Sequence, residues 1–333
     1  MMREVNLLFT SAGRRIELIR AFRRAYTTLR LSGRIVVVDI DPLAPALQEA
    51  DGRYVVRRLD DPEYVPTLLG VCRSERISLV FPLIDPDIPV LACHRRDFEA
   101  AGVQVAVVSE EAAGITADKW QTYQLFREVE APAPRTWADG DVSTSDLIYP
   151  VFVKPRFGSA GRHAQTARDE RELAFVLKCV PTPIVQEYLP GPEITNDVVC
   201  DLDGEILGVI SRRRIEVRWG EVAKGVTVYN PVVTEACVRV ASALRARGPI
   251  TVQCIMKNGT PYFTEINARM GGGIPLAIAA GADIPAWYLA KAAGLPIDIP
   301  PLGSYRTGLY MTRFDESFFF DEAELGEIKS SRL

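Results

Sequence analysis

The sequence contains very little histidine and no paired cysteine motif. There are only two histidines, His94 and His163, and six cysteines are spread over 333 residues without a CxxC pair. A histidine-rich zinc site, or a mechanism that needs several imidazoles, is therefore not expected. The scattered cysteines indicate reduced core thiols and a cytoplasmic protein rather than a disulfide framework.

Long apolar runs and a strong charge of either sign are also missing. No stretch approaches the roughly 18 consecutive apolar residues of a membrane helix, and the N-terminal segment has no small-residue cleavage site of a signal peptide. The formal net charge is −4, so no general affinity for nucleic acid or an anionic membrane is expected. The composition is typical of a soluble globular protein, and the length favours roughly two or three domains.

Two common glycine-rich nucleotide motifs are absent. The turn after the first predicted strand reads TSAGRR, with Gly13 alone where GxGxxG requires three glycines. The glycine-bearing loop at 157–161 lacks the Lys-Ser/Thr pair that ends a P-loop. Neither a dinucleotide-binding Rossmann site nor a P-loop NTPase is therefore expected.

What the first third does contain is an alternation of short apolar runs and helical spacing. This pattern predicts a doubly wound parallel α/β domain, with strands at 5–10, 34–41, 77–85 and 102–109. Asp85 ends one of these runs, at the edge of the sheet where substrates bind. The alternative for Asp85 is an ordinary turn-forming aspartate before a proline.

A lysine stands directly before the glycine-bearing loop. Val151 and Val153 define one face of a predicted strand, and Lys154 lies on the other face. The loop 157–161 can turn tightly and present backbone N–H groups to an anion. A simple hairpin beside a lysine is the alternative.

Three further charged residues stand at conspicuous positions. Lys119 lies in the first turn of a predicted helix, where the helix dipole disfavours a cation, so it indicates either a role away from that helix or an exposed lysine without a role. Glu187 and Glu193 flank a proline-glycine break between two predicted strands. They mark either a hinge whose backbone pairs with a planar base or two solvated carboxylates around a turn.

The stretch YFTEINARMGGG at 262–273 has the strongest pattern. Strict alternation predicts one face that carries Phe263, Glu265, Asn267 and Arg269, and the opposite face carries Thr264, Ile266, Ala268 and Met270. A carboxylate, an amide and a guanidinium at alternate positions, followed by three glycines, are unusual for a structural strand.

In chain order, DKW, VFVKP with its glycine loop, VQEYLPGPE, VQCIM and TEINARM resemble the ATP-grasp superfamily. The chain resembles stand-alone proteins that are similar to one synthetase unit of the carbamoyl phosphate synthetase large subunit, and the resemblance extends to about residue 300. The resemblance implies an N-terminal α/β domain followed by an ATP-grasp fold of two α+β lobes. The expected divisions are 1–113 for the N-terminal domain, 114–188 for the small lobe and 189–333 for the large lobe with a C-terminal tail.

The resemblance also implies a site for Mg-ATP. Lys119 and Lys154 are expected to bind the phosphates, and the loop with Ser159, Ala160 and Gly161 is expected to cover them as a flexible lid. The hinge Glu187, Tyr188 and Leu189 is expected to hold the adenine, and Glu193 the ribose. Gln253, Glu265 and Asn267 are the implied magnesium ligands, and Arg269 and Asn267 are the implied catalytic residues. Oxygen ligands suit Mg²⁺, and the fork of an arginine suits a phosphoryl group.

The register of the hairpin before Glu265 is open from the sequence. A two-residue loop, Asn258-Gly259, pairs Gln253 with Thr264 and turns Gln253 away from Glu265. A three-residue loop that starts at Lys257 pairs Gln253 with Phe263 and puts Gln253 and Glu265 on one face. We predict the three-residue loop, because the resemblance requires a shared face.

The segment 211–228 is expected to meet the acceptor substrate. Arg212 and Arg214 alternate with Arg213 on a predicted strand, so one face carries two guanidiniums. They indicate an anionic, carboxylate-bearing substrate, and a solvated strand edge is the alternative.

The expected activity is that of an ATP- and Mg²⁺-dependent ligase, with Mn²⁺ as an alternative ion. It would activate a carboxylate as an acyl phosphate for attack by an amine, with ADP and phosphate as products. Bicarbonate activation through carboxyphosphate and nucleotide binding without turnover are the alternatives. Carbamoyl phosphate synthesis itself is in doubt, because the chain has one synthetase unit and carries lysines at the phosphate positions. The expected partners are small molecules, and a homodimer is an open alternative to a monomer.

Overall fold

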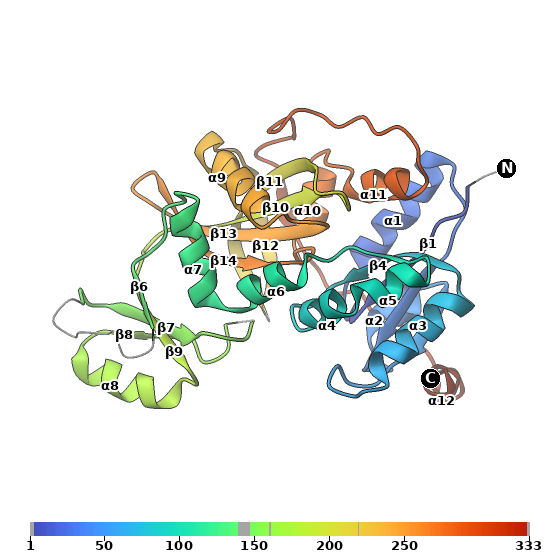
Figure 1. Ribbon diagram of the computed structural model, residues 1–333, viewed down its shortest axis with the longest axis horizontal. Coiled ribbons are helices and arrows are strands. Elements are labelled where there is room, and N and C mark those ends of the chain that lie inside the picture. Colours follow the sequence, from blue (N-terminus) through green and yellow to red (C-terminus); the bar gives the residue numbers. More distant parts are fainter. Residues whose placement is uncertain (1–2, 139–146, 160, 219, 332–333) are drawn as a thin grey trace.

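The computed structural model describes residues 3–138, 147–159, 161–218 and 220–331, and contains three β-sheets (Figure 1). The first sheet is parallel, with the spatial order β3 (Gly52–Val55), β2 (Ile35–Asp39), β1 (Asn6–Thr10), β4 (Ile77–Pro82) and β5 (Gln104–Val105). The chain runs outward in both directions from β1 and β4, which confirms the predicted doubly wound domain.

The apolar runs of these strands are buried under the helices that connect them. These helices are α1 (Ile16–Leu29), α2 (Pro45–Glu49), α3 (Tyr64–Ser74), α4 (Asp87–Cys93) and α5 (Arg95–Ala100). The predicted strand at 102–109 is the least accurate, because β5 is an edge strand that pairs with β4 over only two residues. The chain then continues into α6 (Glu110–Ala117) and α7 (Lys119–Glu128).

The second sheet is small and carries the glycine-bearing loop (lower left in Figure 1). Its spatial order is β6 (Thr136–Ala138), β9 (Pro183–Glu187), β7 (Val151–Pro155) and β8 (Gln165–Ala167), and α8 (Glu170–Cys179) packs on it. Val151 and Val153 belong to a separate core cluster made only of residues from this lobe. This sheet and α8 are therefore packed as a unit of their own.

The third sheet is antiparallel and forms the large lobe. Its order is β14 (Thr260–Asn267), β13 (Pro249–Lys257), β10 (Glu193–Cys200), β11 (Ile206–Arg218), β12 (Glu221–Val228) and β15 (Tyr310–Thr312). The helices of this region are α9 (Pro231–Ala243), α10 (Ile274–Ala279), α11 (Ile284–Ala292) and the C-terminal α12 (Glu322–Ser330). Helix α12 lies away from the large lobe, against β3 of the N-terminal sheet (Figure 1).

The N-terminal domain and the large lobe share their cores. Phe81 on β4 meets Tyr288 on α11 edge to face, with ring centroids 5.1 Å apart. Helix α7, which the expected division assigns to the small lobe, also joins this shared core, because its Phe126 packs against Phe263 on β14 with centroids 5.7 Å apart. Each of the two large core clusters contains residues from both parts. We propose 113/114 and 188/189 as the domain boundaries, since the three sheets fall on the expected sides of them.

The six cysteines are all free thiols, as the sequence predicted. Burial raises the pKa of Cys72, Cys200 and Cys254 to about 12, so these thiols are inert core residues at neutral pH. Within the described ranges, the helices are too short or too polar to cross a membrane.

The backbones of the N-terminal domain and the large lobe approach each other closely at one glycine. Gly248 has a φ of +75°, and a Cβ there would lie 2.8 Å from the carbonyl carbon and oxygen of Ala106. We expect Gly248→Ala to lower the free energy of unfolding by about 1–3 kcal/mol, because the methyl group meets rigid backbone.

Urea unfolding followed by fluorescence checks this prediction. The matched control is Gly114→Ala in α6, where φ is not positive and nothing lies within 4 Å of the added Cβ. The control should be neutral or more stable by roughly 0.5–1 kcal/mol. An equal unfolding midpoint for Gly248→Ala and the wild type would contradict the expectation.

Candidate active site

A deep cleft of about 1050 Å³ opens between the three sheets. Its walls come from the N-terminal domain, the small lobe and the large lobe. The predicted site residues that the structure describes all line this cleft: Asp85, Lys119, Lys154, Ser159, Gly161, Glu187, Tyr188, Leu189, Glu193, Arg212, Arg214, Gln253, Glu265, Asn267 and Arg269. Ala160 lies outside the described residues. The sequence motifs thus meet in one place.

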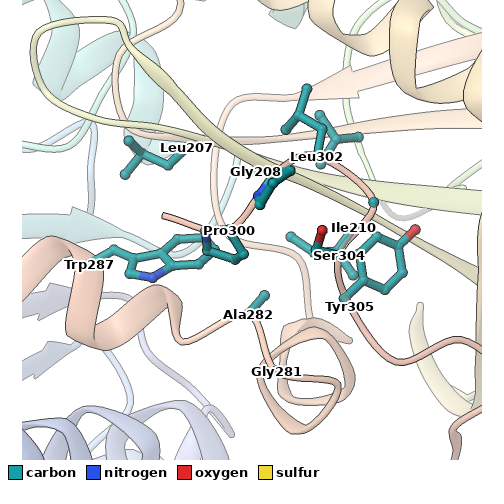
Figure 2. Close-up of a pocket in the computed structure, with 13 residues that line it drawn as sticks. Leu207, Gly208, Ile210, Gly281, Ala282, Trp287, Pro300, Leu302, Ser304 and Tyr305 are labelled. Atoms are coloured by element: carbon teal, nitrogen blue, oxygen red, sulfur yellow. The ribbon is translucent and has the colours of Figure 1, made fainter. Parts of the chain in front are cut away.

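A second hollow is too small to compete with the cleft as a nucleotide site. It lies between β11, α11 and the segment 300–305, where Trp287 and Pro300 face Gly208 (Figure 2). Its volume is about 20 Å³, room for about one water molecule.

The hairpin that carries Glu265 differs from the predicted register. Lys257 pairs with Thr260 across a two-residue turn, in which Asn258 and Gly259 have φ values of +52° and +82°. Two positive φ values are typical of the type I′ turn that Asn-Gly favours. The predicted three-residue loop is therefore wrong.

A β-bulge nevertheless brings the two expected side chains together. The register shifts between Cys254 and Gln253, so that Cys254 pairs with Phe263 and Gln253 pairs with Glu265. Thr264 is the extra residue on β14. The bulge also reverses the predicted face of Phe263, which packs in the core instead of facing the cleft with Glu265.

The candidate metal ligands are one carboxylate and two amides. Gln253 and Glu265 face the cleft as a cross-strand pair, and the buried Asn267 pairs with Thr251 two positions further along. The described residues contain no cluster of three or more His, Cys, Asp or Glu side chains that would hold a metal alone. This donor set suits Mg²⁺ that arrives with phosphate oxygens, because Mg²⁺ uses only one or two carboxylates in such sites.

Two lysines approach the glycine-bearing loop from different elements. Lys154 on β7 is buried, and its Nζ donates to the carbonyl oxygen of Thr264 at 3.3 Å. Burial lowers the pKa of Lys154 to about 8, Glu265 opposes this shift, and Lys119 adds to it. Lys119 begins α7 and donates from Nζ to the carbonyl oxygen of Gly158 at 2.5 Å. A phosphate would relieve the mutual repulsion of the two ammonium groups.

The first turn of α7 is fixed to the end of β7 by an ion pair that the sequence analysis missed. Asp118 caps α7 and accepts from Nε and Nη2 of Arg156, at 2.8 and 2.7 Å. Burial would raise the pKa of Asp118, but the hydrogen bonds from Arg156 and from the capped backbone lower it. The pair holds Lys119 beside the loop that starts one residue after Arg156.

The predicted adenine hinge follows β9 and faces the hairpin. Glu187 accepts from Lys257 at 3.0 Å, Tyr188 is 40% exposed, and Leu189 is buried. Gly191 comes so close to Met256 that an added Cβ would overlap the carbonyl oxygen of that residue. The hinge is therefore pressed against the end of β13, and Lys257 is a partner that the motif did not reveal.

The two arginines predicted to meet the substrate are both paired with carboxylates. Arg212 is buried and forms a bidentate pair with Asp197, at 2.8 and 3.1 Å. Its Nη1 would lie 2.4 Å from a Cβ at Gly273, so it shapes the glycine loop behind Arg269. Arg214 binds Glu193, the predicted ribose ligand, at 2.5 Å. Both arginines line the cleft with a carboxylate partner of their own, and a substrate contact for either stays a prediction.

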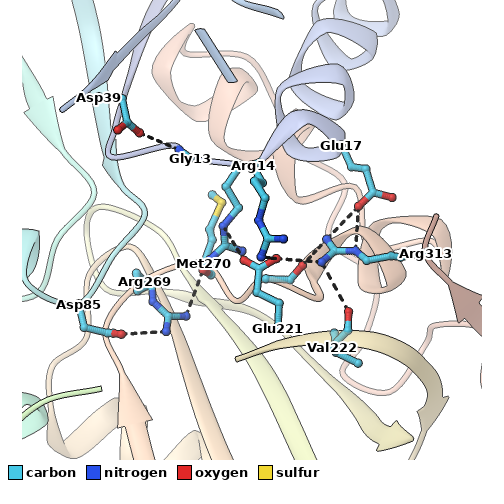
Figure 3. A network of polar contacts seen from close by, with 12 residues as sticks. Gly13, Arg14, Glu17, Asp39, Asp85, Glu221, Val222, Arg269, Met270 and Arg313 are labelled. Atoms are coloured by element: carbon cyan, nitrogen blue, oxygen red, sulfur yellow. Dashed lines mark hydrogen bonds and ion pairs between the residues drawn. The ribbon is translucent and has the colours of Figure 1, made fainter. Parts of the chain in front are cut away.

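The last arginine of the motif reaches across to the N-terminal domain. Arg269 binds Asp85 at 2.9 Å, and Figure 3 shows the two side chains facing each other at one end of a polar network. At the other end, Glu221 lies between Arg14 and Arg313 (Figure 3). The sequence analysis missed Arg15, Glu221 and Arg313. Only the pair of arginines in TSAGRR offered a signal, and that turn was considered for dinucleotide binding alone.

Two protein families match parts of the sequence. Residues 7–106 match the family described as PylC-like, N-terminal domain, and residues 179–312 match ATP-grasp in the biosynthetic pathway with Ter operon. The carbamoyl phosphate synthase large chain of Thermomicrobium roseum is 24% identical over 221 residues, which are 60% of this chain and 19% of that relative. The chain thus spans about a fifth of the length of the curated relative it matches.

Solved structures share the fold over most of the chain. The biotin carboxylase–β,γ-ATP complex from Campylobacter jejuni has a TM-score of 0.73 and 17% identity, and covers 92% of this chain and 74% of that chain. The L-amino acid ligase from Bacillus licheniformis has a TM-score of 0.66 and 17% identity, and covers 88% and 75%. Residues 7–106 thus match a PylC-like N-terminal domain and residues 179–312 match an ATP-grasp family, and the chain is similar in sequence to part of the carbamoyl phosphate synthase large chain and in fold to a biotin carboxylase and an L-amino acid ligase.

Proposed function

We propose that this protein is an ATP- and Mg²⁺-dependent ligase that activates a carboxylate as an acyl phosphate for attack by an amine. The observation that carries the proposal is the convergence of Lys154, Glu265, Asn267 and Arg269 on one cleft. The cleft offers cations for phosphates, oxygen donors for a metal, and a guanidinium beside them. Similarity to ATP-grasp ligases of known structure supports the same class of reaction.

The reaction divides into two balanced steps. A carboxylate oxygen of the substrate attacks the γ-phosphorus of ATP, and the bond from that phosphorus to the β,γ-bridging oxygen breaks to release ADP. The amine nitrogen then attacks the acyl carbon, the amine loses a proton, and phosphate leaves. Activation is needed because a free carboxylate is a poor electrophile.

The residues of the cleft have separate roles in this proposal. Lys119 and Lys154 bind the phosphates, and Arg269 holds the transferred phosphoryl group through its planar fork. Glu265, Asn267 and Gln253 hold Mg²⁺, which when bound neutralises phosphate charge and orients the phosphates. The loop 157–161 covers the phosphates, and the hinge at 187–189 holds the base, with Leu189 acting through its backbone.

Bicarbonate is the second candidate for the activated carboxylate. The similarity to a biotin carboxylase structure and to carbamoyl phosphate synthase favours it. The product would then be carboxyphosphate, formed by the same attack at the γ-phosphorus. A cytoplasmic location, a homodimeric state and Mn²⁺ as a replacement ion remain predictions.

The first prediction concerns which bond of ATP breaks. Because the two lysines and the metal ligands gather where the terminal phosphates would lie, we expect ADP and phosphate rather than AMP and pyrophosphate. Enzyme, Mg-ATP and hydroxylamine are incubated with a panel of acids that includes bicarbonate, and nucleotides and hydroxamate are followed by mass spectrometry. ADP formed in step with a hydroxamate identifies the acid. AMP as the stoichiometric product would reject the proposal.

The second prediction concerns the metal-binding face. Glu265→Gln keeps the shape of the side chain but removes the only carboxylate among the three proposed ligands. We expect turnover to fall by about 100-fold, the scale seen when one electrostatic group at a reacting centre is lost, with a much smaller change in ATP affinity. ADP release is measured at saturating Mg²⁺, and exposed Glu235→Gln on α9 serves as the control. Near wild-type turnover would mean that Glu265 is no metal ligand.

The third prediction concerns the buried lysine. Lys154→Ala removes a charge-assisted contact worth roughly 1.5–3 kcal/mol, so nucleotide affinity should weaken by about one to two orders of magnitude. Calorimetry with a non-hydrolysable ATP analogue measures the affinity, and circular dichroism checks the fold. Lys178→Ala changes an exposed lysine of the same lobe and should leave affinity unchanged. Unaltered affinity in Lys154→Ala would exclude a phosphate contact.

A further inference from the structure

A guanidinium that the proposed reaction does not use lies buried in the wall of the cleft. Arg15 directly precedes α1, and its side chain is only 12% exposed. Its Nη1 is fully buried and has no hydrogen-bond partner among the described residues. A buried charged donor without a partner is costly, so such a group is expected to meet an acceptor when the site is filled.

The charge of Arg15 is only partly balanced within the protein. Its Nε lies 3.5 Å from Glu221, but this carboxylate is shared with Arg313 at 3.1 Å and with Arg14 at 4.0 Å. Burial lowers the pKa of Arg15 to about 10, Glu221 opposes the shift, and Arg269 and Arg313 add to it. Arg15 is still charged at neutral pH, and the repulsion from Arg269 would be relieved by an anion between them.

The position of Arg15 in the fold is one where ligands bind. It follows β1, and Asp85 follows β4, and these are the strands between which the order of the N-terminal sheet reverses. Asp39 at the end of β2 accepts from the backbone nitrogen of Gly13 at 2.9 Å and fixes the loop that leads to Arg15 (Figure 3). The guanidinium is thus held at the crevice of the sheet.

The glycine loop of the large lobe leaves room for this guanidinium. A Cβ at Gly272 would lie 3.0 Å from Nη1 of Arg15 and 3.0 Å from the carboxyl carbon of Glu221. Arg313 donates to the carbonyl oxygen of Gly272 at 2.7 Å and holds the loop in place. Gly272 comes three residues after Arg269, so both guanidiniums border the same end of the cleft.

We infer that Arg15 binds a carboxylate that the substrate carries in addition to its reacting group. The inference rests on the proposed function, because it names the substrate class of the same cleft. The second carboxylate belongs either to the acid that is activated, which is then a dicarboxylate, or to the amine, which is then an amino acid. Arg15 acts in binding and takes no part in the transfer of the phosphoryl group.

The test measures binding rather than turnover. Wild-type protein, Arg15→Gln and Arg24→Gln are each saturated with Mg²⁺ and β,γ-methylene-ATP, so that added carboxylates cannot occupy the phosphate site. Arg24 is an exposed residue of α1, and its replacement changes the charge equally. Melting temperatures are then followed during titration with three pairs of probes. Succinate and glutarate are dicarboxylates, and glutamine and lysine are amino acids. Butyrate lacks the second carboxylate of the dicarboxylates, and butylamine lacks the carboxylate of the amino acids.

We expect succinate and glutarate, or glutamine and lysine, to raise the melting temperature of the wild type and of Arg24→Gln. Butyrate and butylamine should not. In Arg15→Gln the apparent dissociation constant should rise by about tenfold or more, the scale for one charge-assisted contact. A response to the dicarboxylates assigns the second carboxylate to the acid, and a response to the amino acids assigns it to the amine. Gly272→Ala should weaken the same response, and it serves as the second variant if Arg15→Gln does not fold.

Three outcomes would overturn the inference: equal binding by Arg15→Gln and the wild type, binding of butyrate or butylamine that equals that of the dicarboxylates or amino acids to which the wild type responds, or no response of the wild type to any probe. Binding of β,γ-methylene-ATP is measured separately by calorimetry. A wild-type protein that does not bind this analogue would refute the proposed function. Normal nucleotide binding with a carboxylate response that does not depend on Arg15 would refute only the role of Arg15.

Discussion

The pairing of Gln253 with Glu265 is the constraint on which the chemistry of the cleft depends. The bulge at Thr264 separates two halves of β14 that have opposite requirements. Before the bulge, Phe263 fills the core against α7, and after it Glu265 and Asn267 line the cleft. Without the extra residue, strict alternation would put Phe263 and Glu265 on the same face. Either an aromatic ring would enter the cleft or a carboxylate would enter the core, and both are unfavourable.

Several positively charged side chains line the cleft, and carboxylates of the protein itself pair with some of them. Asp197 binds Arg212, and Asp85 binds Arg269. The first pair is buried and the second is partly buried. A buried pair adds little net stability, but removal of one partner leaves an uncompensated charge. The pairs therefore fix the positions of the guanidiniums more than they strengthen the fold. Arg15 is different, because the carboxylate nearest to it serves three arginines.

The order of five short motifs was enough to predict the fold and the residues that share the cleft. Each motif depends on local requirements, such as a lysine before a glycine loop or donors at alternate strand positions, and local requirements are visible in one sequence. The bulge at Thr264, the capture of Arg212 by Asp197 and the position of Arg15 depend on segments far apart in the chain. The spacing of apolar and polar residues along the sequence does not reveal such long-range contacts. The Asn-Gly sequence itself favours the two-residue turn that is observed. The three-residue loop was the wrong prediction, because a shared face for Gln253 and Glu265 requires it only if the strands have no bulge.

The distribution of the core indicates which parts of the site have fixed positions. The N-terminal domain and the large lobe share two core clusters, so Arg15, Asp85 and Arg269 belong to one packed body. The sheet of β6 to β9 has its own core and carries Lys154, whose Nζ reaches the carbonyl oxygen of Thr264 on β14. Acyl phosphates are lost to water unless the reacting end of the cleft is enclosed. A lobe packed separately can approach the phosphates without disturbing the body that orients the acceptor. In the proposed reaction, the packed body would therefore hold the metal and the acceptor, and the small sheet would bring Lys154 and the glycine-bearing loop to the phosphates.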